Sequence, residues 1–169
     1  IPKGLVGSEM CIRDRLNAIQ RDGVPYDLIS KSLPTVEGAV NDILAQIVDF
    51  SVVFSMNGKD IDTHIVYDDD RVWSLELSSG MERFISSLAI RIGLMNVSNL
   101  PQGNFLAIDE GWGTMDSDNL NSVAQLFQYL KSQFQFTFVV SHIETMRDFV
   151  DTLLEIKKID GSSSVRFSR

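Results

Sequence analysis

The stretch that most constrains the fold is an apolar run that ends in two carboxylates. Phe105–Ile108 reads F-L-A-I and is followed directly by Asp109 and Glu110. A short apolar run between turn residues is typical of a strand buried on both faces. Side chains alternate along a strand, so the two acids leave it in different directions, and one can hold a metal ion while the other reaches a water. The plainer alternative is a strand that meets solvent at two acids.

A second apolar run, Phe136–Val140, is followed one residue later by His142. Between the two runs, apolar spacing predicts a helix over Ser117–Lys131. Strand, helix and strand with continuous apolar strands predict parallel pairing with covering helices. Because ligands bind at the carboxyl ends of parallel strands, the acid pair and His142 are expected at one edge of the sheet.

Upstream, the sequence predicts one helix and three antiparallel strands. The helix is expected over Ser32–Asp49, with Pro34 in its first turn. The strands are expected at Phe50–Met56, Ile61–Tyr67 and Arg71–Leu75, the first two joined by a hairpin turn. The fold class is therefore α/β, with an antiparallel β piece ahead of the α/β part.

A Ser-Ser-Gly segment precedes a helix expected over Met81–Val97. Ser78, Ser79 and Gly80 offer hydroxyls, free backbone N–H groups and the positive end of a helix dipole, which together suit an anion. The alternative is a plain helix cap, because Ser79 and Glu82 have the spacing of a capping box. Taken alone, this segment favours the cap.

The C-terminal residues predict a short helix and then a hairpin. The helix is expected over Ile143–Val150. The hairpin strands are expected at Leu153–Ile159 and Val165–Ser168, around a polar loop at Gly161–Ser164.

Composition limits the protein classes and the cellular compartment to which the chain can belong. The 169 residues suit one domain with a real core. A formal net charge of −8 argues against a surface that is wholly a nucleic-acid footprint, but it leaves room for a local basic patch. The single cysteine excludes an internal disulfide framework and a cysteine-based zinc site. No run approaches the roughly 18 apolar residues of a membrane span, and no secretory signal is present, so we expect a cytoplasmic protein without a membrane partner.

The combined motifs resemble the C-terminal ATPase lobe of an SbcC-type DNA-repair ATPase, an ABC-class family related to SMC proteins. L-S-S-G-M-E-R-F-I-S-S-L-A-I (77–90) is similar to the family's signature motif and helix, and F-L-A-I-D-E (105–110) to its Walker B strand. G-W-G-T-M-D (111–116) resembles the stretch with the D-loop, and V-V-S-H-I-E-T-M (139–146) the switch-histidine segment. The resemblance implies the C-terminal half of a P-loop ATPase head.

The resemblance also implies roles at the strand ends. Asp109 would hold Mg²⁺ through water, and Glu110 would polarise the water that attacks ATP. His142 would contact the γ-phosphate. Asp116 would lie in the D-loop and couple two active sites across a dimer of heads.

In the signature segment, the resemblance assigns ATP binding in trans to Ser78, Ser79, Gly80 and Glu82. These residues would contact the nucleotide held by the partner head. Met81 stands where the family has its second glycine, which is a departure from the motif at the phosphate contact.

The domain prediction follows from the same resemblance. Residues 1–15 resemble a translated sequencing adapter and are treated as a non-native extension. Residues 16–31 are assigned to the end of a coiled-coil or linker region, and residues 32–169 to the lobe. Arg83, Arg91, Lys157 and Lys158 are candidate DNA or interface contacts, with a solvated surface as the alternative.

The sequence contains no G-x-x-x-x-G-K-[ST] phosphate cradle. In SbcC-like proteins this motif lies in an N-terminal lobe beyond a long coiled coil, so we expect the chain alone to hydrolyse nothing. The implied partners are that Walker A lobe, a second head forming a homodimer, an SbcD-type metallophosphoesterase nuclease gated by ATP hydrolysis, and DNA. The alternatives are a structural SMC-like head that entraps DNA without a nuclease, and a degenerate, non-hydrolysing head.

Overall fold

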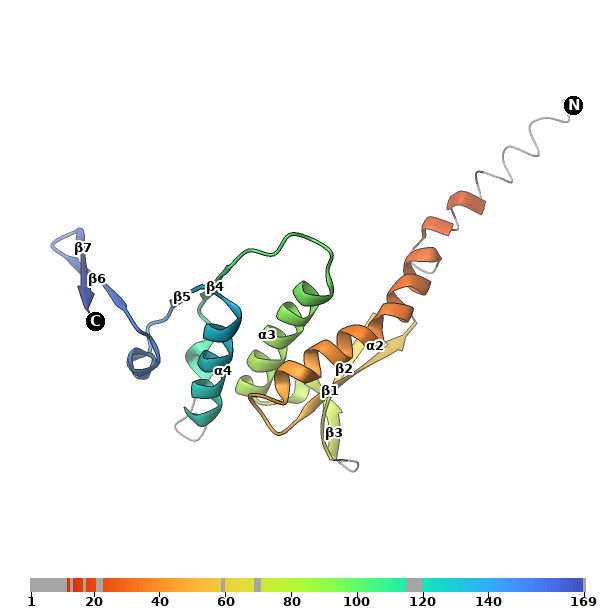
Figure 1. The fold of residues 1–169 in the computed structure, drawn as a ribbon, viewed down its shortest axis with the longest axis horizontal. Helices are drawn as coiled ribbons and strands as arrows, with labels where there is room; N and C mark the ends of the chain where they lie inside the picture. The colour runs from red at the N-terminus through yellow and green to blue at the C-terminus, as the bar shows by residue number, and fades with distance from the viewer. Residues whose placement is uncertain are drawn as a thin grey trace, which may run out of the picture. The chain divides into compact units, whose positions relative to one another are not determined.

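The computed structural model describes residues 12, 14–16, 18–20, 23–58, 60–68, 71–114 and 120–168. The chain divides into two compact units, Ile1–Gln102 and Gly103–Arg169, which are described separately (Figure 1). Unit 1 contains α2 (Val24–Leu44), β1 (Ser51–Asn57), β2 (Asp60–Asp68), β3 (Arg71–Ser74), the 3-10 turn η1 (Leu75–Leu77) and α3 (Gly80–Val97). Unit 2 contains β4 (Phe105–Asp109), η2 (Trp112–Thr114), α4 (Leu120–Gln133), β5 (Phe136–Val140), η4 (Glu144–Phe149), β6 (Leu153–Ile159) and β7 (Ser162–Ser168).

Helix α2 corrects the first helix prediction. It begins at Val24 rather than Ser32 and ends at Leu44 rather than Asp49. Pro25 occupies its first turn, where a missing N–H costs little, whereas Pro34 lies inside the helix with its side chain exposed. An interior proline removes one backbone hydrogen bond, and here the packing of the apolar face outweighs that loss.

The strands of unit 1 form the predicted antiparallel sheet in the order β1-β2-β3. Helices α2 and α3 pack together, and α2 also packs against β1. Their contact is close: a Cβ added to Gly93 would lie 2.7 Å from Val40 Cγ2. The fully or nearly fully buried side chains of this core include Val40, Ile43, Leu44, Ile47, Val52, Ile65, Ile85, Ala89 and Ile92.

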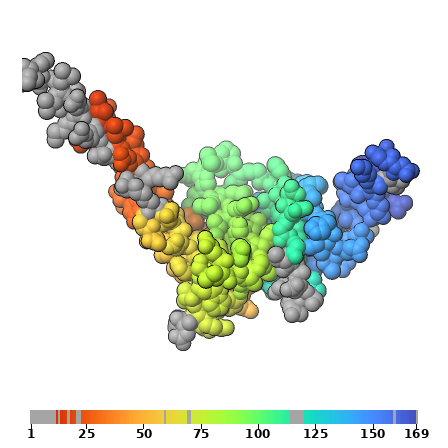
Figure 2. Space-filling model, turned by 180° about the vertical axis from the view of Figure 1, so that it is seen from behind, coloured from red at the N-terminus to blue at the C-terminus, as the bar shows by residue number. Residues whose placement is uncertain are grey.

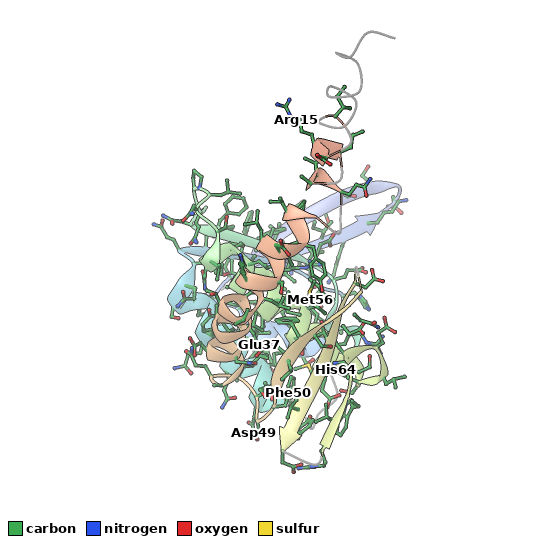
Figure 3. All side chains as sticks on the ribbon, turned by 90° about the vertical axis from the view of Figure 1, so that its right-hand side faces the viewer. Arg15, Glu37, Asp49, Phe50, Met56 and His64 are labelled. Carbon is green, nitrogen blue, oxygen red and sulfur yellow. The ribbon has the colours of Figure 1, made fainter. Side chains whose placement is uncertain are left out.

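Two polar side chains of α2 bind the outer edge of β1. Asn41 donates from Nδ2 to the Val52 carbonyl at 2.9 Å, and its Oδ1 accepts from the Val52 N–H at 2.8 Å. One helical turn earlier, Glu37 Oε2 accepts from the Phe54 N–H at 2.8 Å, and Figure 3 shows Glu37 on the helix beside the strands. The backbone of an edge strand is therefore satisfied by side chains instead of a further strand.

In unit 2, β4 and β5 pair in parallel, from Phe105 opposite Phe136 to Asp109 opposite Val140, as predicted. The prediction that β4 is buried on both faces is wrong. Ile108 is buried, but Phe105 and Phe136 are 65% and 60% exposed. The reason is that a parallel strand needs cover on both faces, and the described residues cover one face of this two-stranded sheet.

The C-terminal hairpin is longer than predicted. Asp160 and Gly161 both have positive φ, 48° and 83°, and form a two-residue turn, so β7 begins at Ser162 rather than Val165. Asp-Gly is a preferred pair for such turns. In Figure 2 the hairpin, in dark blue, extends away from the rest of unit 2. One of its faces carries four exposed apolar side chains, Leu154, Ile156, Val165 and Phe167.

Two further observations complete the fold. The segment predicted as a short α-helix after His142 forms the 3-10 turn η4 instead. None of the described helices is long and apolar enough to cross a membrane.

Candidate functional site

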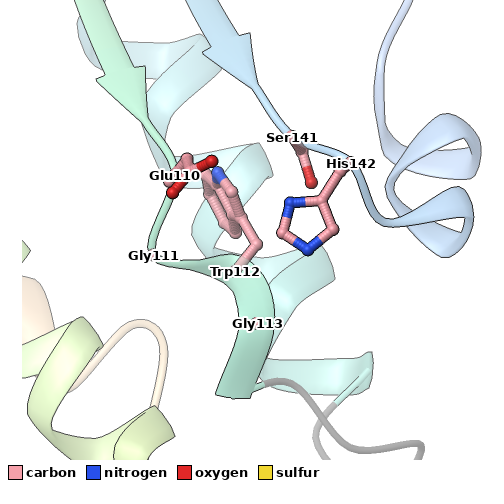
Figure 4. Close-up of a pocket in the computed structure, with 6 residues that line it drawn as sticks. All are labelled: Glu110, Gly111, Trp112, Gly113, Ser141 and His142. Carbon is pink, nitrogen blue, oxygen red and sulfur yellow. The ribbon is translucent and has the colours of Figure 1, made fainter.

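An open pocket of about 270 Å³ lies at the carboxyl ends of β4 and β5. Its lining residues, drawn in Figure 4, are Glu110, Gly111, Trp112, Gly113, Ser141 and His142. The strand-end argument is therefore confirmed for Glu110 and His142, which come together from two strands 32 residues apart in sequence. Asp109 is exposed at the end of β4 and is not among the lining residues.

The chain turns sharply at Glu110. This residue has φ 59° and Gly111 has φ 98°, and the Glu110 N–H donates to the Val140 carbonyl at 3.1 Å. A left-handed backbone is uncommon for a glutamate and costs about 1 kcal/mol or more. The side chain is thus aimed away from the direction that a continuing strand would give it.

Trp112 anchors the turn that follows. Its side chain is 1% exposed, and its ring stacks on Phe127 of α4 at 5.4 Å between centroids. Phe127 in turn stacks on Phe149 of η4 at 5.8 Å. The stack joins the segment after β4, helix α4 and the 3-10 turn η4, and Trp112 is the member of the stack that lines the pocket. Sequence patterns placed Trp112 only within a motif and did not reveal this anchor.

The start of α3 forms the capping box expected from the sequence. Ser79 Oγ accepts from the Glu82 N–H at 3.3 Å, and Glu82 Oε2 accepts from the Ser79 N–H at 2.6 Å. Ser79 is exposed, whereas Ser78 is 6% exposed and donates from Oγ to the Leu75 carbonyl at 2.7 Å. Of the two serines, only Ser79 is exposed.

Tyr67 of β2 also binds Glu82, a contact that was not predicted because no local pattern links the two residues. The Tyr67 hydroxyl donates to Glu82 Oε1 at 2.5 Å. Burial, together with the hydrogen bond to Glu82 and its charge, raises the pKa of Tyr67 to about 12. Burial acts to raise the pKa of Glu82, but the hydrogen bonds from Tyr67 and Ser79 outweigh it and hold that pKa below its usual value.

Of the four candidate DNA or interface contacts, Arg91 and Lys158 are exposed. Arg83, a candidate DNA contact, donates to the carbonyls of Glu76 and Ser78 at 3.2 and 3.0 Å, and Lys157 pairs with Glu155 at 3.2 Å. Asp116 lies outside the described residues.

The side chains present limit the kind of metal site that the described residues can form. No group of three or more His, Cys, Asp or Glu side chains suited to a metal occurs in the described part of the chain. Mg²⁺ commonly uses one or two carboxylates and takes its other ligands from water and substrate phosphates. The exposed carboxylate of Asp109 fits an ion of that kind, and a cage made only of protein ligands does not fit.

Comparison with known proteins identifies the family. No protein-family model matches the chain. An uncharacterized protein of Acanthamoeba polyphaga mimivirus is 34% identical over 160 residues, which are 85% of this chain and 12% of that protein. The SbcC subunit of the SbcCD nuclease of Staphylococcus aureus (strain JH9) is 30% identical over 123 residues, 70% of this chain and 12% of that protein. A chain solved in work on ATP-driven dimerization and DNA-stimulated activation of SMC ATPases matches with a TM-score of 0.68 at 17% identity, covering 85% of this chain and 89% of that chain. This chain is an SbcC-type C-terminal lobe with the fold of SMC ATPase heads.

The lobe is a small part of its longer relatives. It spans 12% of the length of the two curated relatives above. The SMC head domain from Thermotoga maritima matches with a TM-score of 0.59 at 21% identity, and the match covers 85% of the lobe and 51% of that head. The fold prediction, the C-terminal half of a P-loop ATPase head, is thereby confirmed.

Proposed function

We propose that the lobe is half of the ATPase head of a DNA double-strand-break repair or recombination protein. ATP binding joins two such heads, and hydrolysis releases them and gates an associated nuclease that acts on DNA. The observation that carries this proposal is the pocket shared by Glu110 and His142 at two neighbouring strand ends. It is supported by the identity to the SbcC subunit of a protein named as the SbcCD nuclease.

In this proposal the pocket residues divide the chemistry between them. Glu110 accepts a hydrogen bond from the attacking water and orients it, and His142 contacts the γ-phosphate. Asp109 holds Mg²⁺ through water, and the ion neutralises phosphate charge when it is bound with the nucleotide. The left-handed turn at Glu110 supports the division, because it sends this carboxylate into the pocket while Asp109 stays outside it.

In the same proposal, the start of α3 binds the nucleotide that is held by the partner head. A helix N-terminus with free N–H groups favours an anion. Ser79 Oγ already accepts from Glu82, so its own proton is available to a phosphate oxygen. The side chain of Met81 is 5% exposed and turned into the core, so it leaves the space before the helix open. That burial argues against a head made inactive by Met81.

The Walker A lobe of the same protein is the proposed cover for the bare face of the β4-β5 sheet. Phe105, Phe136 and Phe138 on that face are 65%, 60% and 44% exposed, more apolar surface than a parallel sheet leaves in water. The lobe accounts for about half of a solved SMC head, which supports a second half as the missing cover. A homodimer of heads, an SbcD-type metallophosphoesterase and DNA complete the proposed assembly.

A structural head that entraps DNA without a nuclease is the second candidate. It is favoured by the likeness to an SMC head described as bound to the winged-helix domain of ScpA, with a TM-score of 0.63. Purification of the full-length protein with its natural partners separates the two candidates. A metallophosphoesterase in the complex supports the first, and a ScpA-like partner supports the second.

The test of the catalytic assignment is ATP turnover by the full-length protein. Glu110→Gln should lower turnover at least about 100-fold and leave ATP-bound dimers intact, because binding survives and water orientation is lost. Glu144→Gln, an exposed glutamate in η4, is the matched control and should turn over normally. Equal turnover in wild type and Glu110→Gln would refute the role of Glu110.

The signature assignment has its own test. Ser79→Arg should abolish ATP-driven dimerisation with an unchanged circular dichroism spectrum, because the long side chain fills the anion position. Ser30→Arg, at an exposed position of α2, is the control. Dimers that persist in Ser79→Arg would show that nucleotide binds elsewhere.

A further inference from the structure

We propose that Tyr67 is a positioning residue for the start of α3, acting through Glu82 on the group that binds phosphate in trans. The inference deepens the proposed function and rests on it, since it concerns the same anion position at Ser79. Tyr67 lies on β2, in the antiparallel sheet, and touches no nucleotide in this proposal.

Three hydrogen bonds connect the tyrosine to the serine. Tyr67 donates to Glu82 Oε1 at 2.5 Å, the Ser79 N–H donates to Glu82 Oε2 at 2.6 Å, and the Glu82 N–H donates to Ser79 Oγ at 3.3 Å. Both carboxylate oxygens of Glu82 are thus held, one by the sheet and one by the cap. Without the tyrosine, the Ser79 N–H would still donate to Glu82 Oε2, but the carboxylate would be free to rotate around that hydrogen bond.

The position of this carboxylate matters because it is negative and stands at a helix end that has to accept an anion. Like charges a few ångströms apart repel, and the repulsion grows as water is excluded. The Tyr67 hydroxyl fixes the Glu82 carboxylate against β2 and shares its charge through a short hydrogen bond. The outward side of Ser79 and the first N–H groups of α3 are thereby left to the phosphate.

Tyr67 is itself held firmly enough to serve as an anchor. Its ring lies 5.4 Å from the ring of Phe50 and 5.4 Å from that of Trp73, measured between centroids. The guanidinium of Arg71 lies 5.4 Å from the Tyr67 ring centroid and pairs with Asp68 at 2.8 Å. A pKa of about 12 keeps the hydroxyl protonated, so it donates at neutral pH.

The experiment compares Tyr67→Phe with wild type in the full-length protein. We expect the ATP concentration for half-maximal dimerisation and the KM for ATP to rise about tenfold, the size of one hydrogen bond to a charged group. kcat at saturating ATP should stay unchanged. A purely structural defect would instead lower the activity at saturating ATP and leave KM alone. Tyr26→Phe, on α2, is the matched control for loss of a tyrosine hydroxyl.

A second variant tests whether Tyr67 acts through Glu82. Glu82→Gln keeps an oxygen for the Ser79 N–H and removes the negative charge, so Tyr67→Phe should add little in that background. A full additional tenfold loss in the double variant would overturn the inference. So would a normal KM in Tyr67→Phe while Ser79→Arg abolishes dimerisation, and that result would leave the proposed function standing. If Ser79→Arg dimerises normally, the anion position at Ser79 is wrong, and the inference about Tyr67 fails with it.

Discussion

The hydrogen bonds from α2 side chains to the edge of β1 give the most specific stability prediction. Asn41→Ala removes both hydrogen bonds to Val52, which are 2.9 and 2.8 Å long and part-buried. Each bond contributes about 1 kcal/mol, and a buried backbone group left unpaired costs about 1–3 kcal/mol. Because water partly reaches the open edge, we expect the free energy of unfolding to fall by about 2–4 kcal/mol. Alanine favours a helix more than asparagine does, and this returns about a few tenths of a kcal/mol.

The assay is urea unfolding of the chain combined with amide hydrogen exchange. Asn96→Ala is the matched control, because Asn96 is exposed in α3 and the same helix-propensity gain applies there. The Val52 amide should lose its protection in Asn41→Ala and keep it in Asn96→Ala. Equal stability of the two variants, with Val52 still protected, would refute the view that Asn41 stands in for a neighbouring strand.

Three further predictions concern backbone fit and pH. Gly93→Ala should lower the free energy of unfolding by about 1–2 kcal/mol, because the added Cβ would lie 2.7 Å from the buried side chain of Val40. Gly38→Ala should raise it by about 0.5–1 kcal/mol, because the added Cβ has no atom within 4 Å. Urea titrations measure both changes. Glu110→Gly should raise the free energy of unfolding by up to about 1 kcal/mol, because glycine adopts φ 59° without strain. ATP turnover by the full-length protein should be lost in the same variant. A thermal midpoint below that of wild type would contradict the stability prediction. The pKa of Tyr67 is raised from 10.0 to about 12, so the folded state holds this proton more tightly than the unfolded state. The stabilisation is full below pH 10 and disappears between pH 10 and 12, and urea unfolding across that range should show a steeper decline for wild type than for Tyr67→Phe.

Local patterns in the sequence were sufficient to predict the strands β4 and β5, the helix cap at Ser79 and one part of the site. Apolar runs located β4 and β5, and the rule for strand ends brought Glu110 and His142 into one pocket. The capping box at Ser79 followed from spacing alone. In each case the determining interaction lies within a few residues in sequence or follows from strand direction.

The errors and omissions arose where distant or missing residues decide the outcome. The start of α2 was misplaced because Pro34 is tolerated when the helix packs on its neighbours. The bonds from Tyr67 to Glu82 and from Asn41 to Val52 join elements whose register only the folded structure fixes. The exposure of Phe105 depends on what covers the sheet, and the described residues cover one of its two faces.

The bare aromatic face of the β4-β5 sheet has a consequence for how such a half-head is made in the cell. Produced alone, it presents phenylalanines and an apolar hairpin to chaperones and proteases, and it invites aggregation. Carrying the covering half on the same polypeptide would supply it at an effective concentration near the millimolar range, whatever the expression level. The two halves would then be made in equal number, and a half without its cover would be degraded because its apolar face stays exposed.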